Sequence, residues 1–535
     1  MNEIIKIAIE DALEKNNIDF NQVIKIEVPA KKENGDFSTN IAMLLAKSLK
    51  ENPVNIANKL KNSIKNDKII RIEVANPGFI NFFVDKSYLL ENINTVIEQG
   101  ENYGRSNVGN NKKVNIEFVS ANPTGILHMG NARGGAYGDS LARILNFAGY
   151  QATKEYYVND AGNQINNLGL SLQARYFEQC NLPYSMPEDG YHGKEIIEYS
   201  KKLYDENGDK LKEKDINYFK EVATDDLLSR IKSVLSEYGI NYDYFTSEKS
   251  IYEKGNIEKV LKQLAENKQT YIKEDALWFK STNFGDSKDH VLVKADGTYT
   301  YLVPDIAYHI DKIQRGYDHL IDVLGTDHHG YVARLKGALE ALGHPSNMLD
   351  VKLLQLVRLV KDGQEVKMSK RTGNAISLKE LIEEIGVNAA RYFFASRSLD
   401  TQMDFDLELA KKSTSENPVY YVSYAYARIS TILNDNNIEK IEKYTTINEI
   451  DAYNVLEKVY MFQSVVESAA TKELPHLITN YVYELANLFH TFYSNYRIIV
   501  ADKQKTQENL NMINAVRITI FNALNLIGVT PPERM

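Results

Sequence analysis

Two short polar stretches, far apart in the sequence, carry residues that could act on a nucleoside triphosphate. The first is His128-Met129-Gly130-Asn131. Its imidazole can donate to phosphate oxygens, and its glycine lets a ligand approach the backbone closely. The second is Lys367-Met368-Ser369-Lys370-Arg371, which offers ammonium groups. Runs of charge are usually just solvated, so the second stretch gains meaning only if it meets the first.

Together the two stretches suit the release of pyrophosphate from ATP. Negative charge grows on the leaving group during attack at the α-phosphate, and pre-placed Lys367 and Lys370 would stabilise it. His128 would act on the same charge from the opposite side. A carboxylate nucleophile is already ionised, so positioning and electrostatics would suffice without an acid–base residue.

The elements around His128 predict a phosphate-binding turn. Residues 114–119 are apolar and β-branched, as in a buried strand. We predict a loop after them that contains Asn122, Pro123, Gly125 and Gly130. Leu141, Ile144, Leu145 and Ala148 then have helical spacing, and Gly149 stands where the helix would end. A strand, a loop and a helix in this order point backbone N–H groups at phosphate, although ordinary turns of parallel sheets share the pattern.

The rest of the chain predicts a multidomain α/β and α protein. Residues 1–110 predict an α+β domain with a strand at 23–28, a polar turn at 34–40 and strands at 71–74 and 79–84. Residues 111–405 alternate strands and helices, which favours a Rossmann-type parallel-sheet domain. The expected details there are a helical insertion at about 165–285, strands at 290–294, 299–303, 320–324 and 351–360, a helix at 305–315, a turn at Asp362-Gly363, and a capping box of Ser377 and Glu380.

Residues 406–535 predict an all-α helical bundle. Helical patterns cover 419–433, 452–468, 476–498 and 509–526. Tyr420, Tyr421, Tyr424 and Tyr426, with Arg428, could stack on nucleic-acid bases, but their helical spacing favours core packing.

Composition narrows the class of protein. A chain of 535 residues with 43% hydrophobic and 25% charged residues is typical of a soluble protein of several domains. It has no run of about 18 apolar residues, so we expect no membrane span. The single cysteine, Cys180, excludes a disulfide framework and a Cys-based zinc site, and favours the cytoplasm. The net charge of −9 argues weakly against nucleic acid, but a local basic face matters more than the total.

The two polar stretches resemble the two signatures of class I aminoacyl-tRNA synthetases. Longer strings are similar to the bacterial arginyl-tRNA synthetases in particular. These strings run along the whole chain: Ser120-Ala121-Asn122-Pro123-Thr124-Gly125, Asn159-Asp160-Ala161-Gly162-Asn163-Gln164, Pro304-Asp305-Ile306-Ala307-Tyr308-His309 and Pro531-Pro532-Glu533-Arg534-Met535.

The resemblance implies a function and three domains. The activity would be ligation of L-arginine to tRNA(Arg) through arginyl-adenylate, using ATP with Mg²⁺ and no zinc, with tRNA needed for adenylate formation. Residues 1–110 would contact the tRNA elbow, 111–405 would catalyse, and 406–535 would bind the anticodon. A cytoplasmic monomer without membrane contact is implied.

The resemblance also implies site residues. Arginine would be bound by Glu117, Ser120, Asn122, Tyr301 and Asp305. Catalysis would use His128, Asn131, Lys367 and Lys370, and ATP would also meet Gly130, Gly325, Asp327, Met368 and Ser369. The resemblance implies no side chain that binds a metal ion. Asn131 departs from the family pattern, which has a second histidine there.

Two alternatives remain open at this point. An adenylyltransferase acting on a small cofactor precursor shares the first signature, but such chains are generally short and lack a long helical C-terminal domain. A non-catalytic RNA-binding relative would not require intact His128 and Lys370.

Overall fold

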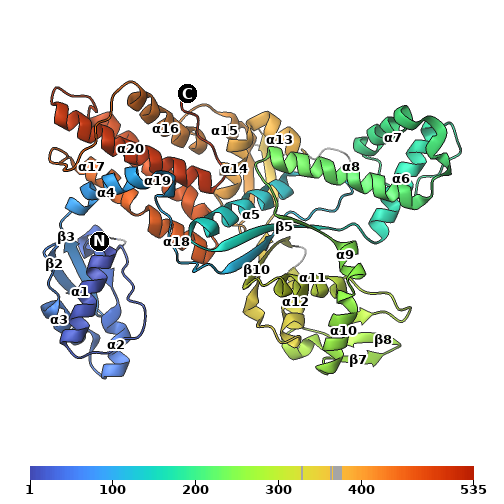
Figure 1. Cartoon of the computed structure of the whole chain (residues 1–535), viewed down its shortest axis with the longest axis horizontal. Helices are drawn as coiled ribbons and strands as arrows, with labels where there is room; N and C mark the ends of the chain where they lie inside the picture. Colours follow the sequence, from blue (N-terminus) through green and yellow to red (C-terminus); the bar gives the residue numbers. More distant parts are fainter. Residues whose placement is uncertain (30, 327–328, 362–363, 366–375) are drawn as a thin grey trace. The chain divides into compact units, whose positions relative to one another are not determined.

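The computed structural model describes residues 1–29, 31–326, 329–361, 364–365 and 376–535. These form two compact units, described separately below (Figure 1). The first unit comprises residues 1–95 and 440–448. The second comprises residues 96–439 and 449–535.

The first unit packs helices against a three-stranded antiparallel sheet of order β1-β3-β2. Its first helix buries Ile5, Ala8, Ala12 and Leu13, which recur at helical spacing. Asn52 caps the third helix by accepting from the N–H of Val54. The elements are α1 (Asn2–Lys15), β1 (Phe37–Thr39), α2 (Ile41–Leu49), α3 (Pro53–Ser63), β2 (Ile69–Ala75), β3 (Phe79–Val84) and α4 (Ser87–Gln99), the last of which continues into the second unit.

Two predictions for this unit are corrected. Residues 23–28 form no strand: only Glu27 pairs, with Ser38, and Val23 is 77% exposed. Apolar and polar residues alternate along this segment, but no single face of it is buried. A strand needs such a buried face to gain stability. The polar turn at 34–40 contains the short buried strand β1, because Phe37 packs into the core beside Tyr88.

The second unit is built on a parallel sheet of order β11-β10-β4-β5-β6, which confirms the predicted architecture. Figure 1 labels β5 and β10 of this sheet. Strand pairing is parallel throughout this sheet. The apolar side chains of Val114, Ile116 and Phe118 account for the central position of β4. The strands are β4 (Lys113–Glu117), β5 (Gln151–Val158), β6 (Tyr244–Ser247), β10 (His319–Gly325) and β11 (Leu349–Leu354).

Helix α5 (Met129–Phe147) packs closely on this sheet. A Cβ atom on Gly138 would lie 2.2 Å from the ring of Phe118, so only glycine permits this approach. The helix begins at Met129, and Gly130 and Asn131 therefore lie in its first turn and not in the predicted loop. Helix propensity did not reveal this start, since three glycines weaken the pattern between Gly134 and Gly138.

The region predicted as a helical insertion holds helices and also strands. Its helices are α6 (Asn163–Gln179), α7 (Lys194–Asn207), α8 (Ile216–Glu237), α9 (Glu248–Glu253) and α10 (Asn256–Glu266). The sequence did not predict three strands here: β6 of the central sheet, and β7 (Thr270–Lys273) and β8 (Ala276–Phe279). Strand β8 pairs with β7 on one side and with β9 (His290–Val293) on the other. Four-residue strands carry too little periodicity to be distinguished from helix.

Two further strand predictions are corrected. Residues 299–303 contribute only the bridge of Tyr299 to Val293, because α11 (Leu302–Gln314) starts there. Residues 351–360 divide into β11 and β12 (Val357–Lys361), which belong to different sheets. The break falls at Gln355 and Leu356. The neighbouring elements are α12 (His329–Ala341), β13 (Gln364–Glu365) and β14 (Met403–Asp406). The predicted turn at 362–363 lies outside the described residues.

The C-terminal part is helical, as predicted. Its helices are α13 (Leu378–Ile385), α14 (Val387–Ala395), α15 (Leu407–Lys411), α16 (Pro418–Asn434), α17 (Ile450–Tyr460), α18 (Phe462–Lys472), α19 (His476–Asn495) and α20 (Lys503–Leu526). The predicted helix at 452–468 is two helices, divided at Met461. Tyr426 is buried, as core packing predicts, whereas Tyr420 and Tyr424 are half-buried and stack on each other.

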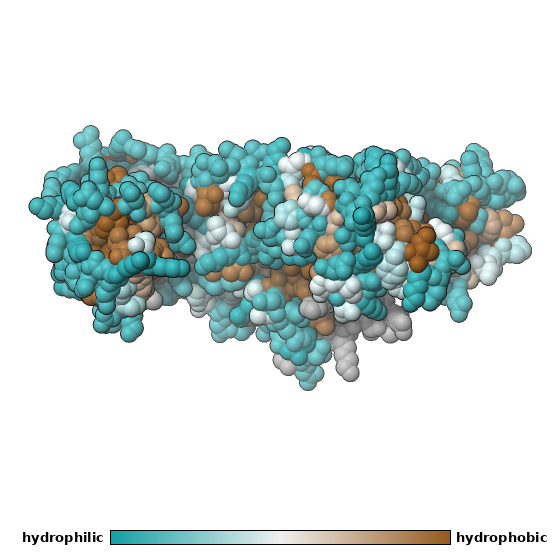
Figure 2. Space-filling view, turned by 90° about the horizontal axis from the view of Figure 1, so that it is seen from below, coloured by the Kyte–Doolittle hydropathy of each residue, from teal (hydrophilic) through white to brown (hydrophobic). Residues whose placement is uncertain are grey.

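The face of the molecule drawn in Figure 2 is mostly hydrophilic, with hydrophobic residues in small groups. Within the described part of the chain, no helix combines the length and the apolar character needed to cross a membrane.

Candidate active site

The carboxyl ends of β4 and β10 meet where the strand order changes direction. From β4 the chain continues to β5 on one side, whereas β10 lies on the other. Ligands of open parallel sheets bind outside such a switch point. A cavity of about 510 Å³ lies there. Its wall contains His128 and Gly130 from α5, Gly325 from β10, and Gln355 between β11 and β12.

The turn that leaves β4 has an unusual backbone. Val119 and Ser120 have φ angles of 68° and 35°, in the left-handed region that a β-branched residue such as valine rarely occupies. Ser120 Oγ accepts from the N–H of Tyr157 at 3.1 Å and donates to Glu117 Oε1 at 3.0 Å. These two hydrogen bonds hold the strained turn against the ends of β4 and β5.

His128 caps α5. Its Nδ1 accepts from the N–H of Gly130 at 3.1 Å, and Asn131 Oδ1 accepts from the N–H of His128 at 3.0 Å. This reciprocal pair is a capping box in which histidine replaces the usual serine or threonine. Asn131 therefore has a structural role at the N-terminus of the helix, where backbone N–H groups favour anions.

A second capped helix begins beside the first. The predicted capping box of Ser377 and Glu380 is confirmed, with Glu380 N–H donating to Ser377 Oγ at 3.1 Å. The N–H of Leu378 donates to the carbonyl of Leu127 at 2.8 Å, and His128 pairs with Ser377 as an antiparallel bridge. On the other side of the segment 366–375, Glu365 lies in the cavity wall. Glu365, before this segment, thus lines the cavity, and Ser377, after it, pairs with His128, which lines the same cavity.

Glu117, at the end of β4, belongs to a buried group of charges. Lys312 Nζ donates to Glu117 Oε2 at 2.7 Å and to Asp322 Oδ1 at 3.2 Å. His309 Nε2 lies 2.7 Å from Asp322 Oδ2. His309 Nδ1 lies 2.8 Å from the backbone carbonyl oxygen of Asp305 and 3.2 Å from its Oδ1. The predicted arginine-binding carboxylates of Glu117 and Asp305 are therefore joined through this group.

Burial and pairing shift the pKa values of these groups. Burial raises the pKa of Glu117, and the Lys312 ammonium opposes that rise. Burial alone would lower the pKa of His309, but the carboxylates of Asp322 and Asp305 raise it to about 10. Burial also acts against ionised Asp322, yet Lys312 and His309 hold its pKa below the ordinary range. His309 is consequently an imidazolium at neutral pH, and both of its ring nitrogens donate.

The other predicted site residues lie in different surroundings. Asn122 Nδ2 donates to Gln164 Oε1 at 2.7 Å, and so connects the turn after β4 to α6. Asp305 lies on α11 and is partly exposed. Tyr301, at the start of the same helix, is 83% exposed, and the structure does not bring its ring against Glu117. Asp327 and the residues Lys367, Met368, Ser369 and Lys370 lie outside the described residues.

Comparison with known proteins identifies the family. Residues 92–429 match the model "tRNA synthetases class I (R), catalytic domain". The arginine–tRNA ligase 1 of Halalkalibacterium halodurans is 48% identical over 522 residues, which are 95% of this chain and 94% of that protein. The chain belongs to the arginyl-tRNA synthetases. These matches do not support the adenylyltransferase alternative, and the catalytic-domain match also stands against a non-catalytic relative.

Further matches extend over the whole synthetase. Residues 2–84 match the arginyl tRNA synthetase N terminal domain, and residues 422–535 match the DALR anticodon binding domain. The arginine–tRNA ligase of Staphylococcus aureus is 48% identical over 523 residues, covering 96% of this chain and 95% of that protein. A putative arginyl t-RNA synthetase structure from Campylobacter jejuni has a TM-score of 0.79 at 36% identity, over 84% of this chain and 100% of that one.

A more distant structure supports the fold alone. The arginyl-tRNA synthetase of Thermus thermophilus has a TM-score of 0.78 at 20% identity, and the match covers 100% of both chains. This synthetase therefore shares its fold with a structure whose sequence has diverged to 20% identity.

Sequence reasoning missed several residues of the synthetase site. Lys312 and His309 follow Asp305 at spacings of seven and four, which place all three on one face of a helix, and this signal was available in the sequence. Arg133 had no such signal. It is buried on α5 and donates to the carbonyl oxygens of Gln355, Ser398 and Thr401, which fixes the cavity wall at Gln355.

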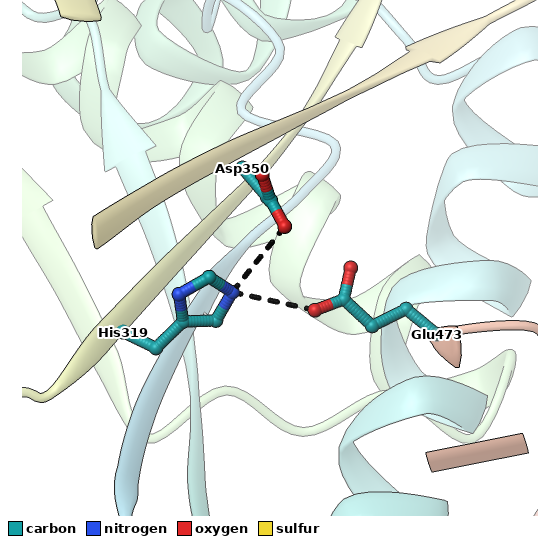
Figure 3. A group of neighbouring side chains, drawn as sticks. All are labelled: His319, Asp350 and Glu473. Atoms are coloured by element: carbon teal, nitrogen blue, oxygen red, sulfur yellow. Dashed lines mark hydrogen bonds and ion pairs between the residues drawn. The ribbon is translucent and has the colours of Figure 1, made fainter. Parts of the chain in front are cut away.

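One group of described side chains in the synthetase has spacing suited to a metal ion. His319, Asp350 and Glu473 each offer a ligand atom within 4.8 Å of the others (Figure 3). Lys352 and Lys336 form ion pairs with the two carboxylates. Because these lysines already neutralise the carboxylates, the arrangement is that of an ion-pair cluster. It lies where β10 and β11 begin, at the edge of the sheet opposite the cavity.

Proposed function

We propose that this chain ligates L-arginine to tRNA(Arg) through arginyl-adenylate, consuming ATP and releasing AMP and pyrophosphate. The observation that carries the proposal is the meeting of two capped helix N-termini at one cavity. Helix α5 brings the first signature there, and the hydrogen bond from Leu378 to Leu127 brings the residues that follow the second signature to the same place.

The site suits ATP as its magnesium complex, which enters as a substrate. In this proposal the N-terminus of α5, with His128 and Gly130, takes phosphate oxygens, since its N–H groups and dipole favour anions. Asn131 holds His128 in place, and Gly325 at the end of β10 lets the nucleotide approach the backbone. Met368 and Ser369 are assigned to ATP by their positions in the second signature, and Asp327, like Gly325, by its resemblance to family residues near the ATP ribose.

The arginine substrate is proposed to bind at Glu117, Ser120, Asn122, Tyr301 and Asp305. A guanidinium has five donors in a fixed fork and suits a site of carboxylates and hydroxyls. Glu117 and Asp305 supply the carboxylates, and the burial of Glu117 and partial burial of Asp305 strengthen their attraction for a cation. Tyr301, exposed in the present structure, is proposed to contact arginine only when the substrate is bound.

The chemistry requires positioning more than proton transfer. The carboxylate of arginine attacks the α-phosphorus of ATP, the bond to the bridging oxygen breaks, and pyrophosphate leaves with the electron pair. His128, Lys367 and Lys370 would stabilise the charge that grows on this leaving group. A terminal ribose hydroxyl of tRNA then attacks the mixed anhydride, which releases AMP.

The three-part division of the chain is also proposed. Residues 1–110 would contact the tRNA elbow, 111–405 would catalyse, and 406–535 would bind the anticodon, in keeping with the domain models matched at 2–84, 92–429 and 422–535. We further propose a monomer that uses no zinc and works in the cytoplasm, where its single cysteine would stay reduced.

Arginine-dependent exchange of pyrophosphate into ATP tests the proposal. We expect exchange only with L-arginine, and much faster with tRNA(Arg) than without it. Chelation should stop exchange, and Mg²⁺ should restore it where Zn²⁺ does not. Exchange that ignores arginine in both conditions would reject the proposed function.

A further inference from the structure

Lys312 is fully buried, which is unusual for a lysine. Its side chain has 0% exposure, and its ammonium contacts Glu117 Oε2 at 2.7 Å and Asp322 Oδ1 at 3.2 Å. A buried ammonium is costly unless carboxylates compensate it. Here the compensation comes from two different strands, because Glu117 ends β4 and Asp322 lies on β10. Lys312 itself lies on α11, so the contact joins three elements at the switch point of the sheet.

The charges continue from Lys312 to the second predicted arginine carboxylate. Asp322 pairs with His309, and His309 pairs with Asp305 one helical turn earlier. The signs alternate along this path from Glu117 to Asp305. Three carboxylates face two cations, Lys312 and His309, so one negative charge is left over. A cationic side chain is the substrate chemistry that would complete the group.

The two oxygens of Glu117 have different tasks. Oε2 is held by Lys312, whereas Oε1 accepts a hydrogen bond from Ser120 Oγ at 3.0 Å. A carboxylate oxygen has two lone pairs, so Oε1 can accept a further donor. The ammonium at Oε2 and the hydroxyl of Ser120 at Oε1 therefore together fix the rotation of the carboxylate, beside Tyr308, which also interacts with Glu117.

We infer that Lys312 is a positioning residue for arginine: its buried ammonium holds Glu117 through Oε2, so that Oε1 is presented to the guanidinium. The inference rests on the proposed function, because it assumes that Glu117 binds the substrate. Lys312 itself does not touch the substrate. The competing explanation is that Lys312 only ties α11 to the sheet, in which case it would affect stability and not arginine recognition.

The test is the variant Lys312→Met, which keeps the length of the side chain and removes the charge. In the pyrophosphate-exchange assay with tRNA, we expect the KM for arginine to rise about tenfold or more, as for a lost charged contact. The KM for ATP should change by less than about twofold, since the ammonium contacts no ATP-binding residue. Equal changes in the two KM values, or no change in the KM for arginine, would overturn the inference.

The pH profile gives a readout that a merely structural lysine would not produce. Burial already raises the pKa of Glu117, and loss of the ammonium would raise it further. In the variant the KM for arginine should therefore fall as pH rises, because more Glu117 becomes ionised, whereas the wild-type KM should change much less. The titratable and charged groups that interact electrostatically with Glu117 lie on four parts of the fold. They are Lys312, His309 and Tyr308 on α11, Asp322 on β10, Tyr157 on β5, and Tyr242 after α8.

Two further variants separate recognition from folding. Lys312→Met combined with Asp322→Asn removes one positive and one negative charge, so this protein is expected to fold even where the single variant does not. It should still show the selective rise in the KM for arginine. Lys154→Met is the matched control, since Lys154 pairs with buried Asp139 and contacts none of these groups. If the wild type shows no arginine-dependent exchange at all, the proposed function fails. If the wild type does show this exchange, but the Lys312 variants have the same KM for arginine as the wild type, the inference about Lys312 alone fails.

Discussion

His128 Nδ1 accepts a hydrogen bond from the backbone N–H of Gly130 at 3.1 Å. An accepting nitrogen carries no proton, so the neutral ring carries its proton on Nε2. The same contact that caps α5 therefore fixes both the orientation and the tautomer of the imidazole. In the proposed complex with ATP, Nε2–H would therefore be the ring atom that donates to a phosphate oxygen.

This relationship predicts the effect of two substitutions at His128. His128→Ala should lower kcat for pyrophosphate exchange by about a hundredfold or more, because one pre-placed donor to the leaving group is lost. His128→Asn keeps an N-cap acceptor and should retain most of the stability, while Ala should cost about 1 kcal/mol in the free energy of unfolding. Exchange kinetics and urea unfolding of both variants check this. Equal kcat in His128→Ala and wild type would leave His128 only its capping role.

A second prediction concerns Lys370 and rests on the position of this residue in the second sequence signature. Lys370→Ala should lower kcat roughly a hundredfold or more, since the charge on departing pyrophosphate loses a stabilising ammonium. Lys379→Ala is the control, because Lys379 is exposed on α13. Steady-state exchange rates of both variants decide the matter. A kinetically silent Lys370→Ala would mean that the segment is an ordinary solvated charge run.

Long-period signals in the sequence predicted the fold well. The strand near residue 114, the helix that follows it, the parallel sheet and the C-terminal helices all rest on buried faces with regular spacing. The Ser377 capping box was also predicted, because its chemistry is local. Short strands such as β6 were missed, since their pairing with β5 is decided by tertiary contacts.

The site was predictable only as far as its chemistry is local or matches a family string. The positions of His128 and Glu117 followed from the sequence, but their partners did not. Glu117 meets Lys312 through a contact between residues 195 apart in sequence, which no periodicity reports. The left-handed backbone at Val119 was equally unpredictable, because valine disfavours it and only the surrounding hydrogen bonds hold it.

Close packing of α5 on the sheet predicts that Gly138 cannot be replaced. Gly138→Ala would put a Cβ atom 2.2 Å from Phe118, so it should lower the free energy of unfolding by about 1–3 kcal/mol through overpacking. The control Gly330→Ala lies on α12 with open space around it, and should be neutral or stabilising. Urea denaturation of both variants measures the difference. Equal stability of the two would mean that the ring of Phe118 can move aside.

Asp139 predicts a loss of stability in acid. Its carboxylate is buried, which alone would raise its pKa, but Arg391, Arg143 and Lys154 lower the pKa to about 2 from an ordinary value of 3.8. A pKa lowered by folding contributes stability above the ordinary value, and this stability is lost as pH falls towards 2. The contribution should be about 2–3 kcal/mol at neutral pH. The difference in unfolding free energy between wild type and Asp139→Asn should thus shrink below about pH 4, and a difference independent of pH would contradict this assignment.

Salt dependence tests whether a local basic surface binds tRNA despite the net charge of −9. Each phosphate contact releases a counterion, so the logarithm of tRNA affinity should fall with the logarithm of salt concentration by about 0.7 per contact, if the single-strand rule applies. Filter binding over a salt series measures the slope. The KM for ATP, measured over the same salt series, serves as the control, because a general effect of salt on the enzyme would change it as well. A steep slope for tRNA would show that clustered cations outweigh the acidic total, because screening makes nearby charges dominate at physiological ionic strength. A flat response would mean that tRNA is held through uncharged contacts, and the proposed elbow and anticodon surfaces would then have to be sought away from lysine and arginine side chains.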